Sequence, residues 1–330
     1  MSQTIATLTL NPAVDVACVA AEVRPTQKIR TADERLDPGG GGINVARVIH
    51  ELGGETLAVI MTGGVTGRLV EELLDQAGVP WKSLPIGGRT RICLNVQERA
   101  SHLEYRFVSE GPLIEAAEWR NSLAILEGLD AGWVVASGSL PRGVPEDFYA
   151  RAAAVGARRG WRFAVDTSGA ALRAVVGQGV DLLKLSHGEF ESLVGHPVEG
   201  QDALAAEIER VLRAGAARMV AVSLGPDGAW LGSAAGLTYL AAPPVQARGA
   251  VGAGDSFMAG LVLGLTRGMS PDEALALAVA AGSASVEFYG TAQARRETVE
   301  ALFRQIGASA PPSVKGPTSG PATGTTRPAG

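Results

Sequence analysis

The sequence predicts an α/β protein in which a doubly wound, mostly parallel sheet carries helices on both faces. Three observations predict this fold. Short apolar runs alternate with segments of helical spacing, several of these runs are apolar on both faces, and 46% of the 330 residues are hydrophobic. Strands buried on both sides are typical of parallel sheets, and the helical segments supply the crossovers between them. Length alone does not decide between one large domain and two smaller ones.

Taken in order, the elements follow from these patterns. The predicted strands are six apolar runs: Ile5–Leu10, Thr56–Met61, Trp133–Ala136, Arg162–Val165, Leu182–Lys184 and Arg218–Val222. The segments with helical spacing are Ile43–Leu52, Arg68–Gln76, Glu115–Glu127, Glu146–Arg159, Gln201–Ala214 and Phe257–Leu265. The Ala-rich run Ala274–Val286 is shorter than the roughly 18 apolar residues of a membrane span, so it is expected to be a buried helix.

Two extended regions, about 14–36 and 90–108, interrupt the strand–helix repetition. In the second region Ile92, Leu94 and Val96 alternate with polar residues, and the polar turn Glu98–His102 joins them to another alternating strand as a hairpin. A few strands with one apolar face cannot bury that face alone. We therefore expect a small sheet that serves as a lid over an active site or packs on the same sheet of a second subunit.

Composition excludes several classes of protein. The net charge of −5 and the pI near 5.5 oppose binding to nucleic acid or to an anionic membrane, so an anionic substrate would need a local cluster of Lys and Arg. The N-terminus has no basic stretch followed by an apolar core, and Cys18 and Cys93 are too few for a disulfide framework. A cytoplasmic protein fits these features. Residues 309–330 are rich in Pro, Gly, Ser and Thr and are expected to be disordered, which leaves 1–308 as the folded part.

The strongest local signal is the run Val251–Phe257, which reads Val-Gly-Ala-Gly-Asp-Ser-Phe and opens a predicted helix. Gly252, Ala253 and Gly254 would place unpaired backbone amides at a helix N-terminus, where they can bind an anion such as a transferring phosphoryl group. Asp255 would then be placed to take a proton from an attacking hydroxyl. The run is not a Walker A loop, and an ordinary helix cap formed by Asp is an equally good explanation of these residues alone.

A second glycine run, residues 39–42, leads directly into the predicted helix that holds Asn44. Four glycines contribute no packing and cost backbone entropy, so a functional reason is expected. They would let the main chain lie against a sugar whose hydroxyls Asn44 binds. A flexible loop is the alternative, but such loops seldom run straight into a helix with a polar first turn.

Together the two runs resemble the signatures of the ribokinase-like (PfkB) carbohydrate kinases. Further matches occur in the same order at residues 7–15, 137–141, 165–169 and 223–228, and the similarity continues to about residue 306. The resemblance implies a ribokinase-like kinase domain over 1–308, ATP as phosphoryl donor and a small-molecule acceptor.

Within the family the sequence is most similar to the phosphosugar branch, and above all to 6-phosphofructokinases of the minor bacterial type. This implies transfer to the C1 hydroxyl of fructose 6-phosphate. Fructose 1-phosphate and tagatose 6-phosphate remain alternatives, although kinases for these sugars usually carry Lys in the glycine run. A nucleoside acceptor is less favoured, and so is a sugar-phosphate-binding protein without activity.

The resemblance also assigns roles to individual residues. Asp255 is the base, beside the anion site of Gly252, Ala253 and Gly254. Substrate binding falls to the sugar-binding residues Asp15, Gly40, Gly41 and Asn44 and to the phosphate-binding residues Lys28, Arg91 and Ser139. ATP is expected to contact Lys184, Ser223, Gly225 and Gly228. The lid implies a homodimer.

Two features concern metals. In this family Mg²⁺ binding is associated with an Asn-x-x-Glu motif, and here Glu189 is present whereas Ser186 replaces the Asn. Mg²⁺ keeps several waters, so this replacement need not abolish its binding. Relatives often bind K⁺ near the segment that corresponds to 287–292, which lacks the usual basic residue. Potassium activation is therefore doubtful.

Overall fold

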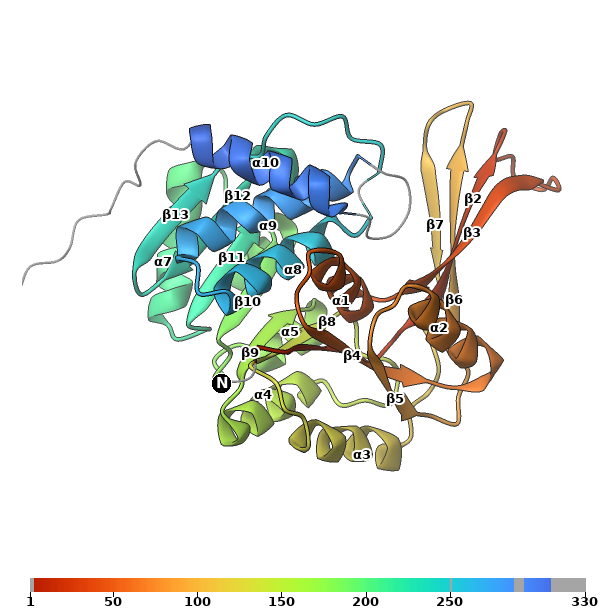
Figure 1. Ribbon diagram of the computed structural model, residues 1–330, viewed down its shortest axis with the longest axis horizontal. Helices are drawn as coiled ribbons and strands as arrows, with labels where there is room; N and C mark the ends of the chain where they lie inside the picture. Colours follow the sequence, from red (N-terminus) through yellow and green to blue (C-terminus); the bar gives the residue numbers. More distant parts are fainter. Residues whose placement is uncertain (1–2, 250, 288–293, 310–330) are drawn as a thin grey trace, which may run out of the picture.

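The computed structural model describes residues 3–249, 251–287 and 294–309 (Figure 1). Within these ranges a nine-stranded sheet has the order β13-β12-β11-β10-β9-β8-β1-β4-β5. Its strands are β1 Ile5–Thr9, β4 Thr56–Thr62, β5 Trp81–Pro85, β8 Trp133–Ser137, β9 Arg162–Asp166, β10 Leu182–Ser186, β11 Met219–Ser223, β12 Ala229–Ser233 and β13 Gly236–Leu240. The strands from β11 to β5 pair in parallel, and only β12 and β13 run antiparallel to their neighbours.

Helices cover both faces of this sheet. One face packs on α1 Gly41–Glu51, α8 Ala253–Thr266, α9 Pro271–Ser285 and α10 Arg296–Ser309. The other packs on α3 Ala116–Glu127, α4 Phe148–Arg159, α5 Gly169–Val175, α6 His187–Val194 and α7 Gln201–Arg213. The predicted doubly wound α/β architecture is confirmed. No helix of the described ranges is long and apolar enough to span a bilayer.

Local sequence explains how these elements form. In β4, Ala58 and Ile60 pack toward one core cluster, whereas Val59 and Met61 pack toward another, so the strand is buried on both faces as a parallel sheet requires. Helix α9 begins with a capping box: the hydroxyl of Ser270 accepts a hydrogen bond from the backbone amide of Glu273, and the Glu273 carboxylate accepts one from the Ser270 amide.

The sequence-based interpretation missed the short elements β5, β12, β13, α5 and α6 and the helix α10. The missed strands contain polar residues or glycines and form no continuous apolar run, and α5 and α6 have seven and eight residues, too few to show a clear helical period. Helix α2, Gly64–Gln76, begins four positions before the predicted start at Arg68. The tail predicted to be disordered lies, beyond Ser309, outside the described residues.

The two extended regions form a separate sheet of the order β3-β2-β6-β7, which stands apart from the main sheet in Figure 1. Its strands are β2 Ala13–Ala20, β3 Thr31–Gly39, β6 Arg91–Glu98 and β7 Glu104–Val108. The expected hairpin is β6–β7, in which Leu94 pairs with Phe107 and Val96 with Tyr105. Strand β3 starts at Thr31, so Lys28 lies in the loop before it.

One face of this small sheet carries a row of apolar side chains, which we call the outer row. Val16 pairs with Leu36 on one side and with Leu94 on the other, and Leu94 pairs with Phe107. Leu36 is 36% exposed, Phe107 58% and the neighbouring Ile92 48%. Because side chains alternate along a strand, the intervening residues point to the opposite face, toward the cavity described next.

Candidate active site

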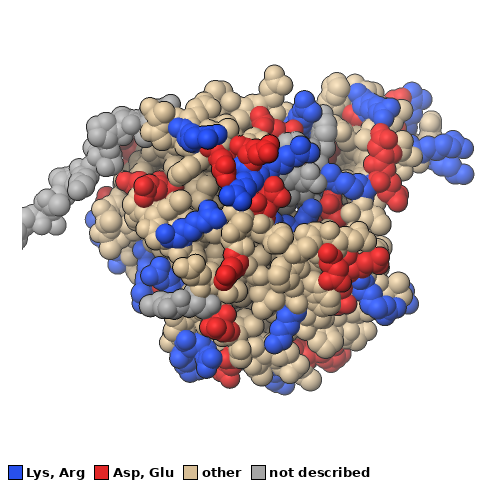
Figure 2. Space-filling view, viewed as in Figure 1, with Lys and Arg blue, Asp and Glu red and all other residues tan. Residues whose placement is uncertain are grey.

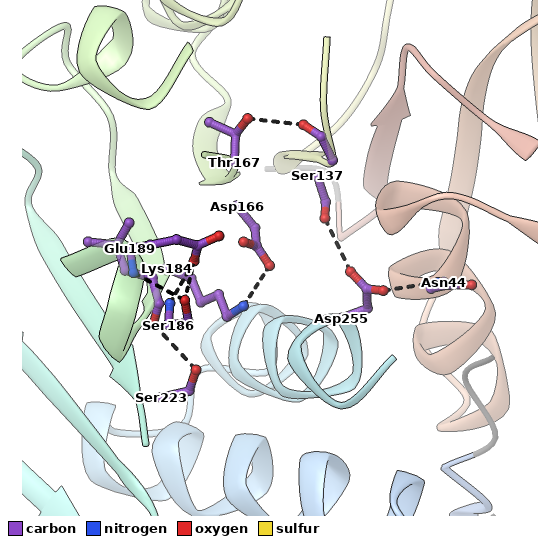
Figure 3. A network of polar contacts seen from close by, with 11 residues as sticks. Asn44, Ser137, Asp166, Thr167, Lys184, Ser186, Glu189, Ser223 and Asp255 are labelled. Carbon is purple, nitrogen blue, oxygen red and sulfur yellow. Dashed lines mark hydrogen bonds and ion pairs between the residues drawn. The ribbon is translucent and has the colours of Figure 1, made fainter. Parts of the chain in front are cut away.

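A cavity of about 340 Å³ lies where the small sheet meets the carboxyl ends of the central strands and the N-termini of α1 and α8. The chain leaves β1 toward β4 on one side and later returns to β8 on the other, so the strand order reverses beside β1. Open α/β sheets bind ligands at such a reversal. Figure 3 shows four of the polar side chains that line it, those of Asn44, Asp166, Lys184 and Asp255, together with neighbouring residues.

Asp255 lies in the first turn of α8 and lines this cavity. Its Oδ2 accepts a hydrogen bond of 2.9 Å from the side-chain amide of Asn44, and its Oδ1 accepts one of 3.3 Å from the hydroxyl of Ser137 (Figure 3). Burial and the nearby charge of Asp166 raise the pKa of Asp255 to about 6, against the lowering effects of Asn44, Lys184 and Ser137. Such a carboxylate suits a base that works near neutral pH.

Gly252 and Gly254 flank the N-terminus of α8, as predicted. Gly252 is the N-cap residue, with a left-handed φ of 81°. A Cβ on Gly254 would lie 2.7 Å from Nζ of Lys184, so glycine is needed here to admit the ammonium group beside the first helical turn. The helix terminus and this cation together favour a negative charge at one place.

Lys184 is only 5% exposed, and its Nζ lies 2.8 Å from Oδ2 of Asp166. Burial lowers the pKa of Lys184, but the charges of Asp166, Asp255 and Glu189 outweigh it, so the net shift is upward and the ammonium stays protonated. Burial raises the pKa of Asp166 despite the opposing charge of Lys184. The pair thus places a permanent cation beside the α8 terminus.

Each glycine of the run 39–42 meets a different neighbour closely. A Cβ on Gly39 would lie 2.3 Å from the carboxyl group of Asp15, and one on Gly41 would lie 2.3 Å from Oγ of Ser137. A Cβ on Gly42 would lie 2.7 Å from the carbonyl oxygen of Leu8, while Gly40 has a φ of +116°. The glycines are therefore explained by the close approach of the α1 N-terminus to the site, and not by the need for a flexible loop.

Asp15, Arg91 and Arg106 line the end of the cavity that the small sheet forms. Burial raises the pKa of Asp15 to about 6; Arg91, Arg106 and Arg47 oppose this, and Asp37 adds to it. The guanidinium of Arg91 donates to the carbonyl oxygens of Ser109 and Asn11, at 2.8 and 2.9 Å. Within the described ranges neither Arg91 nor Arg106 forms an ion pair, so both charges remain available to an anion.

Nine of the predicted site residues line this one cavity: Asp15, Gly40, Gly41, Asn44, Arg91, Lys184, Gly252, Gly254 and Asp255. Others do not line it: Lys28, Ser139, Glu189, Ser223, Gly225, Gly228 and Ala253. Lys28 is exposed in the loop between β2 and β3. The roles given to all of these residues stay predictions.

The residues assigned to ATP surround the carboxyl end of β11. Ser223 ends that strand and donates a 3.4 Å hydrogen bond to the carbonyl of Leu185. Gly225 and Gly228 bracket the short 3₁₀ turn Gly225–Asp227, and both have positive φ. A Cβ on Gly228 would lie 2.0 Å from the carbonyl oxygen of Leu240, so packing alone requires that glycine.

Ser186 and Glu189 form a capping box at the start of α6. Oε2 of Glu189 accepts hydrogen bonds of 2.8 Å from both the amide and the hydroxyl of Ser186. Across the described part of the chain, no three His, Cys, Asp or Glu side chains gather as a metal site. The carboxylates of Asp166 and Glu189, both close enough to Lys184 to raise its pKa, nevertheless fit an ion that keeps most of its waters. The K⁺ expectation concerned residues 287–292, most of which lie outside the described ranges.

Three residues that the sequence-based interpretation did not assign to the site lie in or beside it: Asp166, Ser137 and Arg106. Asp166 and Ser137 end strands β9 and β8, and they stand inside or next to segments already matched to a family pattern. A polar residue directly after a buried apolar run was the available signal. Arg106 had none, because alternation alone does not tell which face of a hairpin meets a ligand.

The sequence pattern of the pfkB family carbohydrate kinases matches residues 9–298. The chain belongs to this family. It is 42% identical over 301 residues to an ATP-dependent 6-phosphofructokinase isozyme 2 of Mycobacterium tuberculosis, which covers 91% of this chain and 88% of the relative. The Escherichia coli isozyme 2 is 35% identical, over 92% of this chain and 98% of its own. A 1-phosphofructokinase of Rhodobacter capsulatus is 30% identical, over 93% and 98% of the two chains.

Solved structures agree with this membership. The crystal structure of phosphofructokinase-2 from E. coli in complex with potassium superimposes with a TM-score of 0.88 and 34% identity, over 92% of this chain and 99% of that one. A tetrameric inhibited form of the same enzyme matches with a TM-score of 0.86 and 33% identity, over 92% and 99% of the two chains. The protein is thus a pfkB carbohydrate kinase, an enzyme class that uses ATP and a divalent metal ion.

Proposed function

We propose that this kinase transfers the γ-phosphoryl group of ATP to the C1 hydroxyl of fructose 6-phosphate and so forms fructose 1,6-bisphosphate. One observation carries the proposal. A single cavity is lined by Asp255, a carboxyl of raised pKa beside an anion site, and by Arg91 and Arg106, two cations with no ion-pair partner among the described residues. A sugar with a hydroxyl at one end and a phosphate at the other matches both ends. The names of the relatives support the same substrate.

The chemistry follows from these groups. Asp255 takes the proton of the C1 hydroxyl as its oxygen bonds to the γ-phosphorus, while the bond to the bridging oxygen breaks and ADP leaves. Asn44 and Ser137 hold the carboxylate in place. The α8 terminus and Lys184 offset charge on the transferring group, and such fixed electrostatics supply much of the rate.

A divalent metal ion, Mg²⁺ in this proposal, would neutralise the phosphates of ATP. Asp166 and Glu189 are the carboxylates that would hold it. Because Oε2 of Glu189 already accepts two hydrogen bonds from Ser186, that carboxyl is oriented without the Asn of the family motif. Arg91 and Arg106 would bind the 6-phosphate, as guanidinium groups suit phosphate oxygens.

The glycine run favours fructose 6-phosphate over the substrates of relatives with Lys in that run. A side chain at position 41 would meet Oγ of Ser137 at 2.3 Å and Oδ1 of Asp255 at 3.1 Å. Lysine there would displace the serine that holds the base. Fructose 1-phosphate is the second candidate, because one relative is a 1-phosphofructokinase.

The test is ADP release from Mg-ATP with a panel of acceptors at matched concentration: fructose 6-phosphate, fructose 1-phosphate, tagatose 6-phosphate and unphosphorylated fructose. We expect the highest kcat/KM with fructose 6-phosphate. A higher value with another acceptor would reassign the substrate. If the folded protein releases no ADP with any acceptor, the proposed kinase activity is wrong. The alternative of a sugar-phosphate-binding protein without activity would then remain.

We further propose a homodimer formed through the outer row of the small sheet, where Leu36, Ile92 and Phe107 are exposed in the single chain. Light scattering should give a dimer or a larger even assembly. Phe107→Asp should dissociate it, because the change would bury an unpaired charge in the proposed apolar interface. Val65→Asp on α2 is the matched control, since Val65 is 71% exposed and lies outside the row. A monomeric parent protein would contradict this proposal.

A further inference from the structure

Asn11 lies at the corner between β1 and β2, within the family-matched segment 7–15, and has no role in the proposed chemistry. Its side chain is only 5% exposed. A buried amide needs partners, because burial without hydrogen bonds is unfavourable. The hydrogen-bond partners of Asn11 include Arg91 and Ser139, two of the predicted phosphate-binding residues.

The side-chain amide of Asn11 donates to the carbonyl oxygen of Glu110 at 3.0 Å and to the hydroxyl of Ser139 at 3.3 Å. Its backbone carbonyl accepts a 2.9 Å hydrogen bond from Arg91, whose other terminal nitrogen donates to the carbonyl of Ser109 at 2.8 Å. These bonds close a ring. It runs from Arg91 to Asn11, through the amide of Asn11 to Glu110, and back through Ser109 to Arg91.

The segment after β7 packs closely on this amide. Gly111 has a φ of +93°, and a Cβ there would lie 2.3 Å from Oδ1 of Asn11. Two polar atoms of the ring, Oδ1 of Asn11 and Nε of Arg91, are buried without a hydrogen-bond partner in the described structure. A buried polar atom that lacks a hydrogen-bond partner is unfavourable to folding. These unpaired atoms disfavour the folded state, so the arrangement is better explained by the placement of Arg91 and Ser139 than by stability.

We propose that Asn11 is a positioning residue for substrate: through Ser139 and the Ser109–Glu110 carbonyls it sets where Arg91 and the Ser139 hydroxyl meet the phosphate of the sugar. This inference rests on the proposed function. Asn11 itself does not touch the substrate. The amide fixes two phosphate ligands from different parts of the chain, which would otherwise be free to separate.

The position predicts a specific defect. Loss of the amide should weaken recognition of the phosphate while leaving the base, the anion site and the ATP contacts unchanged. Asn11→Ala should therefore raise KM for fructose 6-phosphate by about tenfold, the upper end of the effect expected for losing the hydrogen bonds of a neutral amide. The values of kcat and of KM for ATP should stay within a factor of about two.

A double-mutant cycle with Arg91→Gln tests the proposal, with fructose 6-phosphate binding by calorimetry as a readout that needs no turnover. If Asn11 acts through Arg91, Asn11→Ala should add little to the loss caused by Arg91→Gln. Kinetics with unphosphorylated fructose should not change. Additive losses, or equal losses for both sugars, would show a general structural role and overturn the inference.

Asn11→Leu keeps roughly the volume of the side chain and removes its two donors without adding a charge, so it separates hydrogen bonding from packing and also serves if the alanine variant does not fold. It should share the binding defect. Asn121→Ala, on the exposed face of α3, is the control and should be neutral. If the parent protein binds fructose 6-phosphate without turnover, the proposed function fails while the cycle still decides the role of Asn11. If the parent protein binds no sugar phosphate, both fail.

Discussion

The side-chain amide of Asn44 donates a 2.9 Å hydrogen bond to Oδ2 of Asp255, although 211 residues separate the two in sequence. The bond, drawn in Figure 3, joins the first turns of α1 and α8, and residues at both N-termini line the cavity. It orients the carboxylate and lowers its pKa against the larger effect of burial. Asn44, predicted to bind sugar, therefore also holds the proposed base.

Replacing Asp255 with Asn should lower kcat by about 10²- to 10⁴-fold, because that is the usual contribution of a general base. The amide keeps the size of the side chain, so the affinity for fructose 6-phosphate, measured by calorimetry, should change little. Asp202→Asn, on the surface of α7, is the matched control. Near-normal turnover of the Asp255 variant would remove this residue from the mechanism.

The pKa of about 6 for Asp255 predicts the acid side of the pH profile. The base works only when ionised, so kcat should rise with pH through about 6 and then level off. Asn44→Ala removes a bond that lowers this pKa, and the midpoint should move to higher pH. Stopped-time assays across the range would reveal the shift. A midpoint that moved downward would contradict the role of Asn44.

Asp15 and Asp255 should each destabilise the folded protein at neutral pH. Both have a folded-state pKa of about 6, above the ordinary 3.8, so the folded state binds these protons more tightly than the unfolded state does. Their stabilising contribution is present below pH 3.8 and is lost as pH rises to about 6. Asp15→Asn and Asp255→Asn should therefore raise the free energy of unfolding near neutral pH by on the order of 1 kcal/mol, allowing for solvent in the cavity.

The comparison of each variant with the parent protein should be repeated near pH 4, where the gain is expected to shrink. Urea unfolding followed by circular dichroism measures both values. A variant less stable than the parent protein at neutral pH would show that the hydrogen bonds of the carboxylate outweigh its burial.

Breaking the buried pair of Lys184 and Asp166 should be costly. Lys184→Met leaves Asp166 buried without its partner, and such changes destabilise by about 3–5 kcal/mol. The double variant Lys184→Met/Asp166→Asn should recover much of that stability, since neither charge remains. Activity should stay lost in both variants, because the cation beside the α8 terminus is gone. Recovery of turnover in the double variant would exclude Lys184 from phosphoryl transfer.

Gly254→Ala tests the close approach of Lys184 to α8. The added methyl group would lie 2.7 Å from Nζ, so the ammonium must move, and we expect KM for ATP to rise or kcat to fall by at least about tenfold. Gly307→Ala in α10 is the control, because a Cβ there meets nothing within 4 Å. That variant should be fully active and no less stable than the parent protein.

Sequence alone predicted much of the main sheet, because its central strands are apolar on both faces and its helices have clear periods. The hairpin β6–β7 also followed from alternation, with Leu94 opposite Phe107. The antiparallel strands β12 and β13 were missed. They are short and include glycines, so their pairing depends on the neighbouring β11 more than on their own sequence.

The residues of the site likewise fall into those that a local sequence pattern predicts and those that it does not. Asp255 and Asn44 stand in local sequence patterns, and both line the cavity; the roles predicted for them stay predictions. Asp166 and Asn11 stand in segments matched to the family but were given no role from sequence, and Arg106 had no local signal at all. They become part of one site only because the fold brings the ends of β1, β7, β9 and β10 together. The periodicity of the sequence predicts helices and strands, but it does not predict which of their ends will lie side by side.

Acidic and basic side chains intermingle over the face in view in Figure 2, in keeping with a net charge of only −5 on 330 residues. The specificity proposed here does not depend on that overall charge. It depends on which charges inside the cavity lack a partner. Arg91 and Arg106 meet that condition within the described structure, whereas Lys184 is paired with Asp166.

The glycine run 39–42 has a consequence for how this kinase can vary. A stretch of four identical small residues suggests a segment in which any substitution would be harmless. Here each position is fixed by a separate neighbour: Asp15, Thr9, Ser137 and Leu8. In a library of random variants, this stretch should tolerate fewer replacements than surface helical glycines such as Gly188 and Gly307. The glycine run 39–42, which has the simplest composition in the chain, is therefore expected to be among the segments least tolerant of substitution.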